Sequence, residues 1–376
     1  MPMFQSEGWS RLRRIAAMAA LMTLTAPVAL ADPMPALDVL PEGWTTLTPG
    51  GETLCATGTP YSFHVNPSSR DKLLVFFNGG GACWNGDLCD LETEPTPYIF
   101  SAEDPHNDPR VMKGAFDEAN AENPFAGWSK VFVSYCTGDV HLGARDQDYT
   151  TAAGKSVRIH HRGKINAHAA LDWIYANFAK PARIVVAGGS AGSIASPYYA
   201  LEVAEHYPDA SIVQFGGGSG GYTEQAATVS APAWGLIENL PATPEFDLIR
   251  DGAFTFDDLY RATHARFPNM HMAQFNNAYD EAQEMFLKLI GDSERLYGPL
   301  KANLDRLAAD VPMFRSYTAP GIDHTLLRFD RLYTTTVGGV RAVDWVKDLI
   351  EGREVTNVTC GAPEACEGEP PPPKTP

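Results

Sequence analysis

The stretch RIVVAGGSAGS at residues 183–193 decides how this chain is expected to fold. Its apolar first part predicts a buried β-strand over 183–187, and a helical pattern over 193–206 follows the Gly-x-Ser-x-Gly turn. The turn needs small residues because a side chain at Gly188 or Gly192 would collide with the adjacent backbone. A strand, a sharp turn and a helix in this order predict that Ser190 projects as a nucleophile at the carboxyl edge of an α/β sheet.

Apolar runs typical of buried parallel strands alternate with helical patterns along the rest of the chain. The predicted strands cover 72–77, 130–136, 183–187, 211–215, 271–275 and 312–317, and the predicted helices cover 163–178, 193–206, 278–290 and 340–350. This alternation predicts an α/β fold with a mostly parallel central sheet flanked by helices. The alternation of strand and helix patterns is interrupted over 217–267. We interpret this stretch as a candidate cap insertion in a single catalytic domain spanning 32–360.

A second Gly-x-Ser-x-Gly pattern, GGSGG at 217–221, also follows an apolar run. The residues after it form a less clear helix, and Ser219 has glycine on both sides. We therefore interpret this segment as a loop beside the cleft, and Ser190 remains the predicted nucleophile.

A serine nucleophile needs a base and an acid that orients the base, in the chain order Ser, Asp/Glu, His for α/β-hydrolases. Of the histidines after Ser190, His324 is the one in a loop that follows a strand near the end of the chain. Asp280 falls at the carboxyl end of the strand pattern that begins at 271, where it could also cap the next helix. Glu281 and Asp323 remain open as alternatives to Asp280.

An early glycine-rich stretch, NGGGACW at 78–84, follows the predicted strand 72–77. Such a loop is typical of an oxyanion hole, because backbone N–H groups approach the substrate where no side chain intervenes. We predict that the N–H groups of Gly80, Gly81 and Ala191 converge on one oxygen atom.

Composition and charge exclude several classes of function. The chain has 29 Lys and Arg against 46 Asp and Glu, a net charge of −17; without the first 31 residues, which hold three Arg and one Glu, it is −19. So acidic a chain does not fit nucleic-acid binding, and no basic amphipathic run favours docking on anionic lipid. Nor does any stretch predict membrane insertion of the mature chain.

The first 31 residues predict a secretory signal peptide. Arg11, Arg13 and Arg14 precede a short apolar run that ends in Ala29-Leu30-Ala31, so cleavage is expected after Ala31 and the protein is expected to be secreted or periplasmic. Residues 361–376, with four consecutive prolines, predict an extended tail.

Six cysteines in an exported chain predict disulfide bonds. Proximity in the sequence favours Cys83 with Cys89 and Cys360 with Cys366, which leaves Cys55 with Cys136; other pairings remain open by count. No His or Cys cluster has zinc-ligand spacing, so no metal site is expected.

Five motifs together resemble the pectin acetylesterase–Notum family of secreted serine carboxylesterases. They are NGGGACW (78–84), YCTGD (135–139), GGSAGS (188–193), YDEAQ (279–283) and DHT (323–325), spread over residues 55–345. The resemblance implies an α/β-hydrolase fold, a Ser190–Asp280–His324 triad in preference to Glu281 or Asp323, and no metal or organic cofactor. Fewer cysteines than the animal members, and no plant-type His-Cys pattern after His324, make the chain look more like a bacterial relative.

The expected function is therefore hydrolysis of a carboxylic ester with a short acyl group, such as acetate, on a small molecule or carbohydrate. Trp84, Asp139 and His141 are predicted to line the substrate pocket, and Arg158, Arg162 and Lys164 are candidates for a positive patch that would attract a polyanion. The alternatives are a lipase-like or fatty-acyl deacylase and a catalytically silent glycan- or lipid-binding protein. The sequence does not indicate an oligomeric state.

Overall fold

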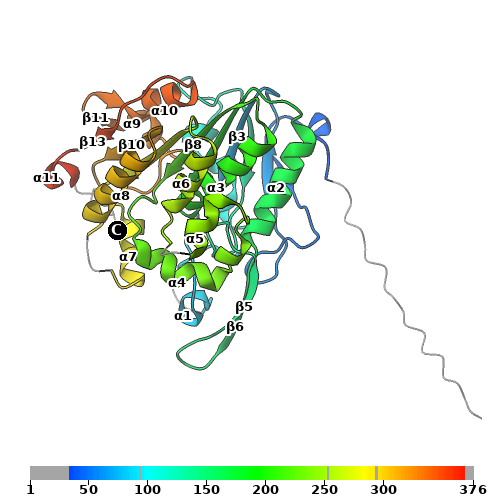
Figure 1. Cartoon of the computed structure of the whole chain (residues 1–376). Helices are drawn as coiled ribbons and strands as arrows, with labels where there is room; N and C mark the ends of the chain where they lie inside the picture. The colour runs from blue at the N-terminus through cyan, green and yellow to red at the C-terminus, as the bar shows by residue number, and fades with distance from the viewer. Residues whose placement is uncertain (1–33, 93–94, 252–253, 293–294, 369–376) are drawn as a thin grey trace, which may run out of the picture. The chain divides into compact units, whose positions relative to one another are not determined.

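The computed structural model describes residues 34–92, 95–251, 254–292 and 295–368 (Figure 1). Within these ranges, a nine-stranded sheet has the order β1-β2-β4-β3-β7-β8-β9-β10-β13. Its strands are β1 (Thr45–Leu47), β2 (Phe63–Asn66), β3 (Lys72–Phe77), β4 (Ser129–Val133), β7 (Arg183–Gly189), β8 (Ser211–Gly217), β9 (His271–Asn277), β10 (Phe314–Ala319) and β13 (Val358–Thr359). The predicted signal peptide lies outside the described residues.

The sheet is parallel from β4 through β13 and antiparallel only at the β1–β2–β4 edge. In the parallel part, β7 lies between β3 and β8, so the strand that leads to Ser190 is central. Parallel strands need helical crossovers that cover both faces of the sheet, which is why the buried strands are apolar on both sides.

Side chains of one strand alternate between two hydrophobic clusters. Leu73, Val75 and Phe77 of β3 pack with α2 and α3 on one face, and Leu74 and Phe76 pack with α9 and α10 on the other. Figure 1 shows α2 and α3 over one face of the central strands. The helices are α1 (Gly86–Cys89), α2 (Gly163–Asn177), α3 (Ala191–His206), α4 (Glu224–Trp234), α5 (Asp247–Asp251), α6 (Asp258–Arg266), α7 (Glu281–Leu289), α8 (Tyr297–Asp310), α9 (Arg331–Thr334), α10 (Ala342–Ile350) and α11 (Pro363–Cys366).

The predicted α/β class is confirmed, and the predicted strands and helices correspond to β3, β4, β7 to β10, α2, α3, α7 and α10. The sequence patterns missed the short edge strands β1 and β2, helix α8, and a hairpin of β5 (Arg145–Thr150) and β6 (Ser156–His161). The hairpin forms a separate two-stranded sheet, and its charged, half-exposed strands lack the apolar run that signals a buried strand. A second small pair joins β11 (Thr336–Val337) to β12 (Val340–Arg341).

The candidate cap region 217–267 has two different parts. Helix α6 packs on α3 within the core, where the Thr263 hydroxyl donates to the carbonyl of Pro197 at 2.8 Å. It is therefore the crossover helix between β8 and β9. Helix α4 instead lines a pocket beside Ser190. The part of the region before α6 therefore remains the candidate cap.

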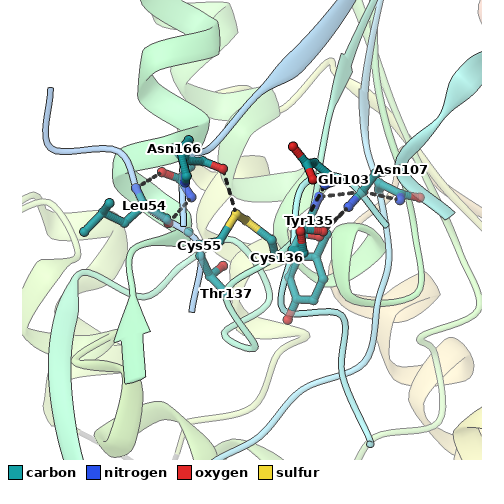
Figure 2. The surroundings of a disulfide bond; sticks show 12 residues. Leu54, Cys55, Glu103, Asn107, Tyr135, Cys136, Thr137 and Asn166 are labelled. Atoms are coloured by element: carbon teal, nitrogen blue, oxygen red, sulfur yellow. Dashed lines mark hydrogen bonds between the residues drawn. A yellow bond between two sulfur atoms is a disulfide. The ribbon is translucent and has the colours of Figure 1, made fainter. Parts of the chain in front are cut away.

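The three disulfide bonds have the predicted pairing: Cys55–Cys136, Cys83–Cys89 and Cys360–Cys366. Figure 2 shows the first one, which joins the segment before β2 to the end of β4. Beside it, the Asn166 amide accepts from the Leu54 N–H at 3.1 Å and donates to the Leu54 carbonyl at 2.8 Å. The disulfide bond therefore fixes this segment to the residues after β4, and the amide fixes it to α2.

The predicted domain boundary at residue 360 falls inside a closed loop. The Cys360–Cys366 bond encloses α11, and the Gly321 N–H donates to the Cys366 carbonyl at 2.9 Å. Residues 361–368 therefore pack against the loop that carries His324, while the proline run at 370–373 lies outside the described residues. In the part of the chain that the structure describes, no helix has the length and apolar character needed to span a membrane.

The Cys55–Cys136 bond closes 81 residues of sequence, whereas Cys83–Cys89 closes six. Since the entropy that a cross-link removes from the unfolded chain grows with loop length, replacing Cys55 and Cys136 by alanine should lower the free energy of unfolding by about 4 kcal/mol. The matched Cys83→Ala/Cys89→Ala variant should lose about 2 kcal/mol. Urea denaturation measures both, and equal losses would contradict the entropic explanation.

Candidate active site

Ser190 lies at the turn between β7 and α3, with a backbone conformation that L-residues rarely adopt. Its φ is 55° and its ψ is −121°. Hydrogen bonds to neighbouring residues hold this strained conformation. The Ser190 N–H donates to the Gly217 carbonyl at 2.7 Å, and the Ser190 carbonyl accepts from the Ser193 N–H at 2.9 Å. A strained turn that persists because its surroundings fix it is typical of a functional position.

The glycines around Ser190 are required by close backbone approach. A Cβ on Gly188 would clash with the Gly192 carbonyl, and one on Gly192 would clash with the carbonyl of Phe77 at the end of β3. From the other side, a Cβ on Gly79 would lie 2.6 Å from the Ser190 Cβ. The loop after β3 and the turn after β7 are therefore in close contact at Ser190.

Asp280 and His324 form a direct pair. The Nδ1 atom of His324 lies 2.6 Å from the Oδ2 atom of Asp280, which is 0% exposed. Asp280 also caps α7, because its Oδ1 atom accepts from the N–H groups of Ala282 and Gln283 at 3.0 and 3.1 Å. Asp280 therefore contacts the imidazole and caps the helix at the same time.

The alternative acids do not reach the imidazole. Glu281 is exposed on α7, and Asp323 forms an ion pair with Arg331 at 3.0 Å. Arg331 also donates to the His324 carbonyl at 2.6 Å, which fixes the loop after β10.

The glycine loop 78–84 is anchored by its first residue. The Asn78 amide donates to the His106 carbonyl at 2.8 Å, and its Oδ1 atom accepts from Arg328 at 2.8 Å. Among the described residues, none of the N–H groups of Gly80, Gly81 and Ala191 donates to a protein acceptor. These groups remain available to a bound oxygen.

Two pockets meet at Ser190. One is narrow and apolar, and its cavity volume, taken as the space open to the centre of a water molecule, is ≈ 40 Å³. Its walls include Trp84, Ala191, Ile194, Ala226, Trp234, Phe256 and Phe286. The other is more open, with a volume of ≈ 420 Å³ by the same measure, and includes Gly80, Gly81, Tyr98, Asp104, His106, His324 and Arg328. Ser190 lies on both pockets.

Comparison with known proteins identifies the family of the chain. A family model described as Pectinacetylesterase matches residues 47–233, which include the glycine loop and Ser190. The chain belongs to the pectinacetylesterase family. It is similar to the palmitoleoyl-protein carboxylesterase NOTUM of Mus musculus (32% identical over 94 residues, 24% of this chain) and of Homo sapiens (31% over 94 residues).

The aligned segment spans only 18% of the length of these two curated relatives. Among solved structures, the Wnt deacylase Notum from Drosophila is similar, with a TM-score of 0.60 and 16% identity over 81% of this chain and 93% of that chain. At that identity the likeness shows the fold, which is of the α/β-hydrolase type.

Asp139 and His141 do not line either pocket of this pectinacetylesterase family member, which differs from the prediction. Both are buried behind the glycine loop: the ring Nε2 of His141 lies 2.7 Å from the Asn78 carbonyl, and Asp139 accepts from the Gly163 N–H at 2.7 Å. Burial lowers the pKa of His141 to about 4 and raises the pKa of Asp139 to about 7. His141 therefore supports the glycine loop from behind, and Asp139 holds the start of α2, whereas Trp84 does line the apolar pocket.

The predicted positive patch is also absent from the two pockets. Arg162 forms two hydrogen bonds with Asp146 at 2.8 Å, Arg158 pairs with Asp148, and Lys164 donates to the Asn239 carbonyl. The arginine that does line the polar pocket is Arg328, which no motif singled out. Its position follows from contact between two loops 250 residues apart, and sequence patterns do not carry that information.

Within the described ranges, the residues that bring three candidate metal-ligand atoms close together are Cys83, Cys89 and His161. The two sulfur atoms are joined in a disulfide bond, so they do not offer thiolate ligands.

The buried His141 makes stability depend on pH. The pKa of His141 is about 4 in the folded state and 6.5 in the unfolded chain. The contribution of the neutral His141 to the free energy of unfolding is therefore fully present above pH 6.5 and is lost as the pH falls towards 4. A glutamine can still donate to the Asn78 carbonyl but does not titrate. Between pH 7 and pH 4.5, the His141→Gln variant should therefore lose ~2 kcal/mol less of its free energy of unfolding than the wild type.

Urea denaturation at the two pH values measures this difference. The exposed His206→Gln variant is the matched control and should keep the wild-type pH dependence. If His141→Gln follows the wild type as well, His141 is not a buried neutral histidine.

Proposed function

We propose that this chain is a serine carboxylesterase that works through Ser190, His324 and Asp280. The observation that carries the proposal is that His324 lines the same pocket as the strained Ser190 while its Nδ1 atom lies 2.6 Å from the buried Asp280 carboxylate. Because Nδ1 of His324 donates to Asp280, Nε2 carries the free lone pair and can accept the Ser190 proton. The serine oxygen then attacks the acyl carbonyl, the alcohol leaves with the proton from His324, and water releases the acyl group in the second half of the reaction.

The developing negative charge on the carbonyl oxygen needs donors that are already in place. The free N–H groups of Gly80, Gly81 and Ala191 suit this role, and each such donor contributes about 3 kcal/mol of transition-state stabilisation. Gly79 and Asn78 hold the loop against the serine, so the donors are fixed before the substrate binds.

The apolar pocket supports binding of an acyl group. It is narrow, and its walls are mostly aliphatic and aromatic side chains beside Ser190. We assign a short acyl group, such as acetyl, as the substrate to test first, and a fatty-acyl group, such as the palmitoleoyl group in the names of the curated relatives, as the alternative.

The polar pocket favours a hydroxyl-rich alcohol, such as a carbohydrate. It offers Asp104, His106 and the Arg328 guanidinium as hydrogen-bond partners, and the half-exposed ring of Phe100 as an apolar surface for a sugar face. Arg328 supplies a local positive charge in a chain whose net charge is −17. Its pKa, lowered by burial to about 10, leaves it charged at neutral pH.

The three disulfide bonds support a location outside the cytoplasm, in agreement with the predicted leader at residues 1–31. A catalytically silent scaffold is not favoured, because competent residues occupy every position that the reaction needs.

The Ser190→Ala variant should hydrolyse p-nitrophenyl acetate slower than the wild type by roughly four orders of magnitude, because the nucleophile is lost. The matched control is Ser211→Ala, an exposed serine at the opposite end of the neighbouring strand β8, which should stay within about twofold of the wild type. Equal rates for wild type and Ser190→Ala would exclude the proposed chemistry, as would failure of the folded wild type to react with a fluorophosphonate.

Enlarging the apolar pocket should extend the acyl group that it accepts. Phe256 lines this pocket and is 8% exposed, so Phe256→Ala should raise kcat/KM for p-nitrophenyl hexanoate relative to acetate by about tenfold. An unchanged ratio would show that the acyl group binds elsewhere.

A further inference from the structure

Gln283 is a fully buried polar side chain between Asp280 and the loop 217–221. It is 0% exposed, its Nε2 lies 3.1 Å from the Oδ2 atom of Asp280, and its Oε1 accepts from the Gly221 N–H at 3.0 Å. A backbone N–H can only donate, so Oε1 must face Gly221 and Nε2 must face Asp280. The orientation of the amide is therefore determined by its partners.

Gln283 and His324 share one carboxylate oxygen. Oδ2 of Asp280 accepts from Nδ1 of His324 and from Nε2 of Gln283, while Oδ1 accepts from two backbone N–H groups of α7. A buried carboxylate with four donors is held in one orientation. The Gln283 amide is the only side-chain donor to Asp280, other than the imidazole, within the described ranges.

The second Gly-x-Ser-x-Gly segment, which the proposed reaction does not use directly, is the other partner of Gln283. The Ser219 and Gly220 N–H groups donate to Oδ1 of Asn276 at 3.1 and 3.0 Å. Gly218 lies against the imidazole, since a Cβ there would be 2.9 Å from Cε1 of His324. The loop beside the cleft is thus a packed support for the ring.

We propose that Gln283 is a positioning residue that couples Asp280 to the loop 217–221 and so holds His324 in its reactive tautomer and orientation. The proposal rests on the proposed serine-esterase function. Without the amide, Asp280 and Gly221 each lose a partner in a site closed to water, and the carboxylate and the loop that flank His324 become free to shift.

Other charged groups near His324 are already engaged or lie across the pocket. Arg331 donates to the His324 carbonyl and pairs with Asp323. Burial and the nearby Asp280 charge raise the pKa of Tyr222, which keeps this phenol neutral. The remaining charged or titratable side chains are Glu281 and Glu284 on α7 and Asp104, His106 and Arg328 across the polar pocket. None of them replaces the amide as a partner of Asp280.

Two substitutions separate positioning from simple packing. Gln283→Met keeps the length of the side chain and removes the donor and acceptor. Gln283→Glu keeps the acceptor for Gly221, and its introduced carboxylic acid donates to Asp280 only while it is protonated. When that acid ionises, it faces the Asp280 carboxylate with a like charge, and the hydrogen bond between residue 283 and Asp280 is lost. Gln147→Glu, on the β5–β6 hairpin, makes the same chemical change away from the site.

The measurement is kcat and KM for p-nitrophenyl acetate between pH 5 and pH 9. We expect Gln283→Met to lower kcat at least tenfold at every pH, with KM within about threefold. Gln283→Glu should retain more activity than Gln283→Met at acidic pH and lose it towards alkaline pH, through an ionisation that the wild type and Gln147→Glu lack.

A Gln283→Glu profile with the wild-type shape would overturn the proposal, as would wild-type kcat in Gln283→Met. If circular dichroism shows that Gln283→Met does not fold, the pH profile of kcat for Gln283→Glu tests the proposal by itself. A wild type that is inactive and does not react with a fluorophosphonate would instead refute the proposed function, so the two failures are distinguishable.

Discussion

The close approach of backbone segments around Ser190 is the constraint on which the rest of the site depends. The turn after β7 touches the end of β3 through Gly192 and the glycine loop through Gly79, and β8 holds the Ser190 N–H through the Gly217 carbonyl. Side chains would force these segments apart, so glycine is required at the contacts. The same proximity brings the free N–H groups of the glycine loop next to the serine, which makes the packing constraint and the catalytic geometry one feature.

The second feature of the site is a buried carboxylate that is held by four hydrogen-bond donors. Asp280 receives four hydrogen bonds, two of them from the first turn of α7, where the helix dipole also favours a negative charge. A carboxylate in this setting can orient an imidazole and stabilise its protonated form.

The two pockets that meet at Ser190 offer different environments. One is narrow and apolar, and the other is polar and more open. The disulfide bonds strengthen this layout at its margins: Cys83–Cys89 closes the turn after the glycine loop, and the Cys360–Cys366 loop packs behind the segment that carries His324.

The sequence by itself determined the class of fold, the central strands, the nucleophile turn and the pairing of nearby cysteines. These features have local signatures: an apolar run such as 183–187 can only be a buried strand or helix, and a Gly-x-Ser-x-Gly turn between a strand and a helix has few conformations. It also narrowed the acid and base to a few residues. Edge strands β1 and β2 and the charged β5–β6 hairpin were missed because short or polar strands carry no such signature.

Only the tertiary structure decided which acid meets His324, that Asp139 and His141 lie behind the glycine loop, and that Arg328 and Gln283 reach the site. Each of these facts depends on contacts between segments distant in sequence, such as Arg328 with Asn78 or Gln283 with Gly221. The physical reason is that burial and hydrogen-bond partners are properties of the packed chain, because the sheet brings together residues that the local pattern cannot relate.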